Sequence, residues 1–154
     1  AAKKMVPPRY QGYEADELAA VPLAHGGLLK VVAGVVHGAV GPVETTSPMT
    51  YAHAVLEHGD VVEWKPDTGH TALVHVFDGT VTVNDQIVGE GDMVVFDRTE
   101  GVVRVLAHEK KAQVLLLGGQ PLGEPVSRYG PFVMNSRQEI VQAVDDYQSG
   151  RLVQ

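Results

Sequence analysis

Histidines are the residues in this sequence with the clearest capacity for chemistry. The chain has seven, and four lie within a short stretch, at His53, His58, His70 and His75. Imidazole binds transition metals, and a strand presents two such ligands on one face at positions i and i+2. Here the spacing within each pair is five residues (53 to 58, 70 to 75), which on a regular strand places the two side chains on opposite faces. We therefore expect scattered surface histidines or hydrogen-bonded core histidines, with a metal site on these four residues as the alternative.

Other catalytic patterns are missing from the sequence. With no cysteine, the chain has no disulfide, no thiolate metal site and no cysteine nucleophile, and this fits a reducing cytosol. No Gly-x-Ser-x-Gly elbow occurs, and "GGQPLG" lacks the strand–turn–helix context of a dinucleotide-binding loop. We assign no catalytic residue and no cofactor-binding residue, and we expect a cytoplasmic protein.

The length and the net charge of the chain limit which partners and locations are expected. The 154 residues fit one domain with a real core, and 12 basic against 19 acidic residues give a net charge of −7. Phosphate contacts need clustered cations, so direct nucleic-acid binding is not expected. No apolar run approaches the roughly 20 residues of a membrane span.

The elements that must position any site are mostly strands. Between residues 28 and 118, short β-branched segments alternate with turns such as Asn84-Asp85, which predicts an antiparallel sandwich or barrel. The expected strands are Leu28–Val36, Met49–Leu56, Val61–Trp64, Thr71–Phe77, Thr80–Val83, Gln86–Val88, Met93–Phe96, Val102–Ala107 and Ala112–Leu117. Inside such a barrel, alternate residues of a strand face the interior. The lining sets considered are Ala52, Ala54 and Leu56, or Thr71, Leu73 and His75.

Both ends of the chain differ from this middle. Residues 1–22 read as an extended lead in which "EADELAA" could form one helical turn. Residues 121–154 read as an irregular arm followed by a helix. Ser136 and Glu139 predict a capping box at its start, Ile140, Val144 and Tyr147 share one face, and Gly150 ends it.

Several stretches resemble the pirin family of the cupin superfamily. They are "KMVPPRYQGY" (4–13), "GPVET" (41–45), "GHTALVHVFDGTV" (69–81) and, most specifically, "LLLGGQPLGEPVSRYGPFVMNSRQEI" (115–140). The resemblance implies an all-β fold, a cupin or double-stranded β-helix (jelly-roll) barrel with one C-terminal α-helix. It matches the interdomain linker (1–22), the C-terminal cupin barrel (23–120) and the arm with its helix (121–154).

The resemblance also implies where a metal belongs. Pirins carry iron on three histidines and one glutamate in an N-terminal cupin domain, which this sequence lacks. Counting back from Gly79, the positions equivalent to two histidines and the glutamate hold Lys65, Asp67 and Ala72, while Val102 lies in the window for the last histidine. A lysine there would repel a cation, so we expect no cofactor in this chain.

By resemblance, intact pirins act as quercetin 2,3-dioxygenase-like enzymes or as regulators such as transcription co-regulators. We expect this chain to be the metal-free partner domain of a bicupin, inactive alone. The alternatives are a stand-alone module that binds proteins or a small ligand as a dimer, and a single cupin with its own histidine metal site. The expected partners are an N-terminal pirin domain, a second copy of the chain or a regulatory protein. The predicted contact residues are Tyr129, Gly130, Pro131, Phe132, Val133, Met134 and Asn135.

Overall fold

The computed structural model describes residues 3–4, 6–7, 9–108 and 111–152. Expectations that fall on residues 1–2, 5, 8, 109–110 and 153–154, including parts of the lead, lie outside the described residues. The chain divides into two compact units. We call Gly12–Pro121 the barrel unit, and Ala1–Gln11 with Leu122–Gln154 the arm unit.

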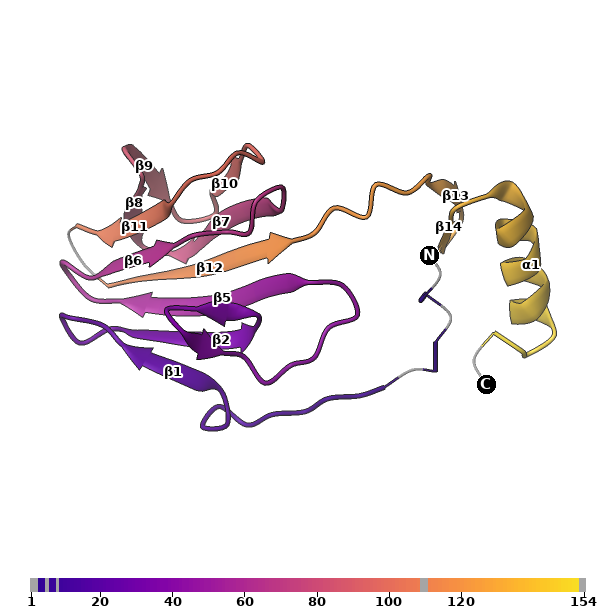
Figure 1. Ribbon diagram of the computed structural model, residues 1–154, viewed down its shortest axis with the longest axis horizontal. Helices are drawn as coiled ribbons and strands as arrows, with labels where there is room; N and C mark the ends of the chain where they lie inside the picture. Colours follow the sequence, from indigo (N-terminus) through magenta and orange to yellow (C-terminus); the bar gives the residue numbers. More distant parts are fainter. Residues whose placement is uncertain (1–2, 5, 8, 109–110, 153–154) are drawn as a thin grey trace. The chain divides into compact units, whose positions relative to one another are not determined.

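The barrel unit consists of two antiparallel sheets and a small strand pair (Figure 1). The six-stranded sheet has the order β1 (Ala19–Pro22), β2 (Leu28–Ala33), β5 (Met49–Leu56), β12 (Ala112–Gly119), β7 (Thr71–Asp78) and β10 (Met93–Phe96). The four-stranded sheet has the order β6 (Val61–Trp64), β11 (Val103–Ala107), β8 (Thr80–Val83) and β9 (Gln86–Gly89). The pair is β3 (Val35–Val36) with β4 (Ala39–Val40).

The core lies between the two sheets. Along each long strand every second residue is buried, as the period of two of a strand requires. Val31, Leu56 and Leu116 of the six-stranded sheet and Val62 and Val105 of the four-stranded sheet belong to one buried cluster. The expected all-β sandwich is therefore confirmed.

Most strands lie where the sequence predicts them, and β5, β6, β8 and β10 match to the residue. Asn84, at a φ of +50°, forms the predicted tight hairpin in which Val83 pairs with Gln86. The expected strand Leu28–Val36 is interrupted at Gly34, which has a φ of +76° and separates β2 from β3. The expected helical turn is replaced by one hydrogen-bonded turn, in which the amide of Glu17 donates to the carbonyl of Glu14. Ala19 and Ala20 already belong to β1.

One of the two lining sets is correct. Ala52, Ala54 and Leu56 are fully buried in the core. The set on β7 is wrong, because its buried residues are the intervening ones, Ala72, Val74 and Val76. β7 is apolar on both faces, so alternation alone does not tell which face is inside. As a consequence, Leu73 and His75 lie on the solvent side of the six-stranded sheet.

A buried carboxylate joins two turns of the barrel unit. Asp60, with 0% of its surface exposed, accepts hydrogen bonds from the backbone amides of His25 (2.7 Å), Gly27 (2.8 Å) and Glu57 (2.9 Å). Burial alone would raise the pKa of Asp60, but these three amides, together with the nearby His25 ring, hold it below its usual value. The charge therefore stays buried because the backbone solvates it.

The arm unit contains a small hairpin and the C-terminal helix. The segment expected to be irregular forms β13 (Ser127–Tyr129) and β14 (Phe132–Met134), joined by a turn in which Gly130 has a φ of +53°. The helix α1 (Arg137–Gln148) follows at once. Its capping box is confirmed: Ser136 accepts from the amide of Glu139, and the Glu139 carboxylate accepts from the amide of Ser136.

Candidate functional site

The first candidate site is a cavity where β6 ends, lined by Lys65 and Asp67, which the family resemblance predicts to stand at ligand positions. We call it the mouth cavity. It has a volume of about 310 Å³ and is lined by Trp64, Lys65 and Asp67 together with Met49 and Thr50 at the start of β5, among others. Trp64 is 4% exposed and packs against Gly118, where an added β-carbon would lie 2.8 Å from the indole ring. The indole therefore fills the barrel beneath this cavity.

Lys65 already has a partner at the edge of the mouth cavity. Its ammonium lies 2.7 Å from the Glu100 carboxylate, and both side chains are exposed. The hydrogen bond and the opposite charge raise the pKa of Lys65 and lower that of Glu100. Lys65, at a predicted ligand position, is therefore a protonated cation at neutral pH.

These residues do not fit an iron ion. Ala72 is buried in β7 and offers only a methyl group, and Lys65 offers a positive charge. Asp67 is a possible ligand, and its carboxylate lies 3.8 Å from the ring of His70. Val102 is an exposed apolar side chain. One carboxylate with a nearby cation cannot replace three imidazoles and a glutamate.

The four histidines of the alternative metal site are distributed over different places. His53 on β5 and His75 on β7 share the solvent face of the six-stranded sheet, with Leu115 of β12 between them. His58 is exposed in the turn before β6, and His70 lies in the loop before β7. Among the described residues, no group of three or more His, Cys, Asp or Glu is arranged to hold a metal ion.

The predicted partner-contact residues lie together in the arm unit. Phe132 packs edge-on against Tyr147 of α1, with ring centroids 5.9 Å apart. Asn135 anchors the start of the helix, because its amide donates to Glu139 and its side chain donates to the carbonyl of Pro125. Tyr129 and Val133 remain exposed. The hairpin and the helix thus support each other, but part of their apolar surface has no cover within the described part of this unit.

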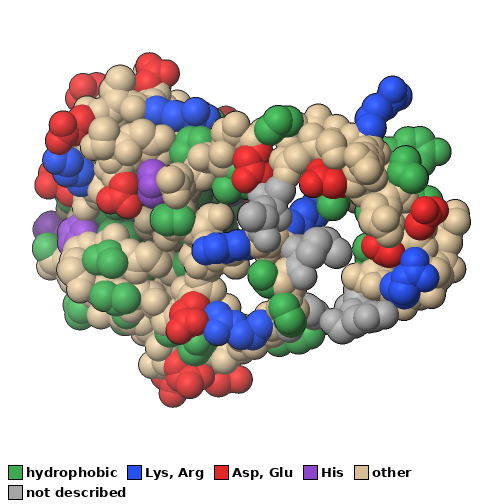
Figure 2. Space-filling model, turned by 45° about the vertical axis from the view of Figure 1, so that its right-hand side comes forward, with side chains coloured by type: hydrophobic (Ala, Val, Ile, Leu, Met, Phe, Trp, Pro, Cys, Tyr) green, Lys and Arg blue, Asp and Glu red, His purple; other side chains and the backbone are tan. Residues whose placement is uncertain are grey.

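A groove runs between the hairpin and α1. We call it the arm groove. Its volume is about 690 Å³, and Tyr129, Ile140, Val141 and Val144 supply its apolar walls, with Arg128 and Arg137 among the polar lining residues. Tyr129 is 68% exposed and Val141 61% exposed. Figure 2 shows hydrophobic side chains at the surface among charged ones. A groove of this composition is typical of a surface that receives a partner.

The family is decided by comparison with known proteins. The sequence pattern of the Pirin C-terminal cupin domain matches residues 51–153. The chain belongs to the pirin family. A putative quercetin 2,3-dioxygenase of Pseudomonas aeruginosa is 39% identical over 151 residues, which are 97% of this chain and 52% of that protein. Human pirin is 28% identical over 162 residues, covering 97% of this chain and 53% of its own length.

A solved pirin-family structure agrees with the fold. The crystal structure of a quercetin 2,3-dioxygenase from Acinetobacter baumannii superposes with a TM-score of 0.87 at 38% identity, over 98% of this chain and 53% of that one. This confirms the cupin jelly-roll. The chain spans about half the length of the relatives it matches. No helix among the described residues is long and apolar enough to cross a membrane.

Sequence reasoning missed Trp64, which lines the mouth cavity, and Glu100, the ion-pair partner of Lys65. It assigned no role to Trp64 or to Glu100, although Trp64 directly precedes the Lys65 position. A large aromatic residue beside an altered ligand position is a signal that the cavity is filled by protein. Glu100 carried no such signal, because its pairing with Lys65 spans 35 residues of sequence.

Proposed function

We propose that this chain is the metal-free partner domain of a two-domain pirin. The observation that carries this proposal is the set of side chains at the predicted ligand positions, where Lys65 is paired with Glu100 and Ala72 is buried. A barrel with these residues has the family's fold without the family's ligands. Oxidation of a flavonol would then belong to the whole protein and would depend on a second barrel that holds the metal.

The arm unit supports the same proposal. Its residues come from both ends of the chain, and the Lys4 ammonium donates a hydrogen bond to the carbonyl of Val133. Exposed apolar side chains surround its hairpin and helix, including Val126, Tyr129, Val141 and Tyr147. The relatives are about twice as long as this chain, and the half that the chain does not span is the occupant proposed for this surface.

The binding test uses sedimentation velocity with the separately produced N-terminal half of the Pseudomonas aeruginosa relative. We expect a one-to-one complex that is weakened by Tyr129→Ser and by Val141→Ser, since both remove apolar area from the arm groove. Ile87→Ser is the matched control, because Ile87 is 81% exposed on β9 of the barrel unit. A chain that forms only dimers with itself, or a complex equally strong with all three variants, would contradict the proposal.

The activity test measures oxygen consumption with quercetin after the chain has been incubated with Fe(II). We expect no turnover above that of iron alone. Turnover that depends on the protein would show that the barrel carries its own catalytic metal. A role as a transcription co-regulator, a regulatory protein partner and a cytoplasmic location stay predictions of the family resemblance.

A further inference from the structure

The solvent face of the six-stranded sheet carries an ordered row of side chains that the proposed function does not use. Register places Lys30 of β2 opposite His53 of β5, His53 opposite Leu115 of β12, and Leu115 opposite His75 of β7. Their sequence neighbours, such as Val31, point into the core. The row is therefore fixed on the outer face by strand alternation.

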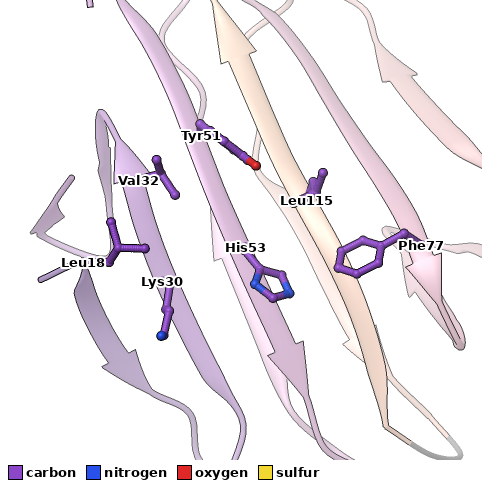
Figure 3. A pocket seen from close by; sticks show the side chains of 7 residues that line it. All are labelled: Leu18, Lys30, Val32, Tyr51, His53, Phe77 and Leu115. Carbon is purple, nitrogen blue, oxygen red and sulfur yellow. The ribbon is translucent and has the colours of Figure 1, made fainter. Parts of the chain in front are cut away.

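A β-bulge adds an aromatic ring to this row. Val114 pairs with Val76 and Gln113 pairs with Asp78, so Phe77 is the extra residue of β7. Bulges redirect side chains and often lie beside functional sites. The Phe77 ring extends over β12 toward β5, with its centroid 5.3 Å from that of His53 and 6.5 Å from that of His75 (Figure 3).

The result is a concave pocket of about 430 Å³ on the outer face of the sheet. Leu18, Val32 and Leu115 form its aliphatic walls, Phe77 and His53 present aromatic rings, and Lys30 and Tyr51 bring polar ends (Figure 3). It shares no lining residue with the mouth cavity. Its volume lies in the range of small-molecule sites, roughly 300–1,000 Å³. Apolar walls with a few polar groups are also typical of such sites.

The polar groups of this pocket retain hydrogen-bonding capacity. The Lys30 ammonium donates to the carbonyl of Ala15 at 2.9 Å, which leaves two of its three N–H groups. No ion pair involves Lys30 in the described part of the chain, and the Tyr51 hydroxyl makes no hydrogen bond there. His53 is held by Gln113, at 3.2 Å. The pocket thus offers a positive charge and a hydroxyl beside two aromatic rings that are tilted against each other.

We propose that this outer-face pocket binds a planar aromatic carboxylate. The ring of the ligand packs against Phe77 and the aliphatic walls, and its carboxylate accepts a hydrogen bond from the Lys30 ammonium. Offset or edge-on aromatic contacts would hold the ring of the ligand, and charge-assisted hydrogen bonds would hold its carboxylate. The proposal does not depend on a metal or on a second domain.

Calorimetric and NMR titration of the full chain with 2-naphthoate tests this. We expect saturable one-to-one binding with shifted amide signals at Lys30, His53 and Phe77. Lys30→Met should weaken the affinity about tenfold or more, since a hydrogen bond to a charged group is lost. Phe77→Leu should weaken it several-fold, because an aromatic contact is lost. Lys111→Met is the control, because that exposed lysine faces Glu57.

A neutral analogue separates recognition of charge from loss of structure. The wild-type chain should bind 2-naphthamide about tenfold more weakly than 2-naphthoate, whereas Lys30→Met should bind the two compounds equally. Circular dichroism checks that each variant is folded. Binding that does not saturate, shifts confined to the arm unit, or an acid-over-amide preference that survives in Lys30→Met would overturn the proposal.

Discussion

The backbone amide of Gly27 donates a 2.8 Å hydrogen bond to the buried carboxylate of Asp60. Gly27 lies in the turn between β1 and β2, and Asp60 lies directly before β6, so the contact joins the two sheets of the barrel unit. A β-carbon on Gly27 would overlap the Asp60 carboxylate, and only glycine allows this approach. A buried carboxylate that accepts three backbone hydrogen bonds therefore holds these two turns together.

Asp60→Asn should destabilise the protein. The substitution removes the charge and turns an amide N–H₂ toward backbone donors, so the free energy of unfolding should fall by about 2–4 kcal/mol. Urea denaturation measures the change. Glu90→Gln, in the exposed turn before β10, is the control and should change stability by less than about 0.5 kcal/mol. Equal effects of the two substitutions would show that the Asp60 network is not stabilising.

The same carboxylate predicts an acid transition. The pKa of Asp60 is lower in the folded chain than in the unfolded chain. Its contribution to the free energy of unfolding is therefore complete above the unfolded pKa of about 4. That contribution is lost as the pH falls from about 4 through the lower, folded pKa. Urea titrations from neutral to acidic pH should show Asp60→Asn approaching the wild type only in this range. A difference between the two that is constant with pH would refute the assignment.

Gly118→Ala tests the packing under the mouth cavity. An added methyl group meets the Trp64 ring and must displace it, which should cost about 1–3 kcal/mol. The tryptophan fluorescence should change as well, because this is the single Trp of the chain. Gly101→Ala, where nothing lies within 4 Å of the new carbon, should leave both unchanged. If Gly118→Ala also leaves both unchanged, the indole does not fill the barrel as described.

Ser136→Ala tests the cap of α1. Loss of the capping hydrogen bond should destabilise the helix by about 1 kcal/mol, and hydrogen exchange of the Glu139 amide should become faster. Gln138→Ala, on an exposed position of the first turn, should leave that exchange rate unchanged or lower it. Unchanged protection in Ser136→Ala would mean that the hairpin, not the cap, holds the helix start.

Local patterns predicted most of this fold. The strands β5, β6, β8 and β10 follow from alternation between turn residues, and α1 follows from its capping box, because these signals lie within a few residues. β1 and β4 could not be recognised from their own short sequences, since pairing with other strands defines them.

The sites were less predictable than the fold. The sequence counting predicted that Lys65 and Ala72 occupy altered ligand positions, but it could not show the distant partner Glu100. It placed Leu73 and His75 inside the barrel, although a strand that is apolar on both faces leaves its orientation open. The outer-face pocket depends on a bulge at Phe77, which only the pairing of β7 with β12 reveals.

The central proposal is that this pirin barrel holds no iron of its own. The most direct test is elemental analysis of the purified chain after anaerobic loading with Fe(II) and desalting. The donor set around Lys65, Asp67 and Ala72 predicts an iron content close to none per chain, whereas one retained iron per chain would contradict the claim.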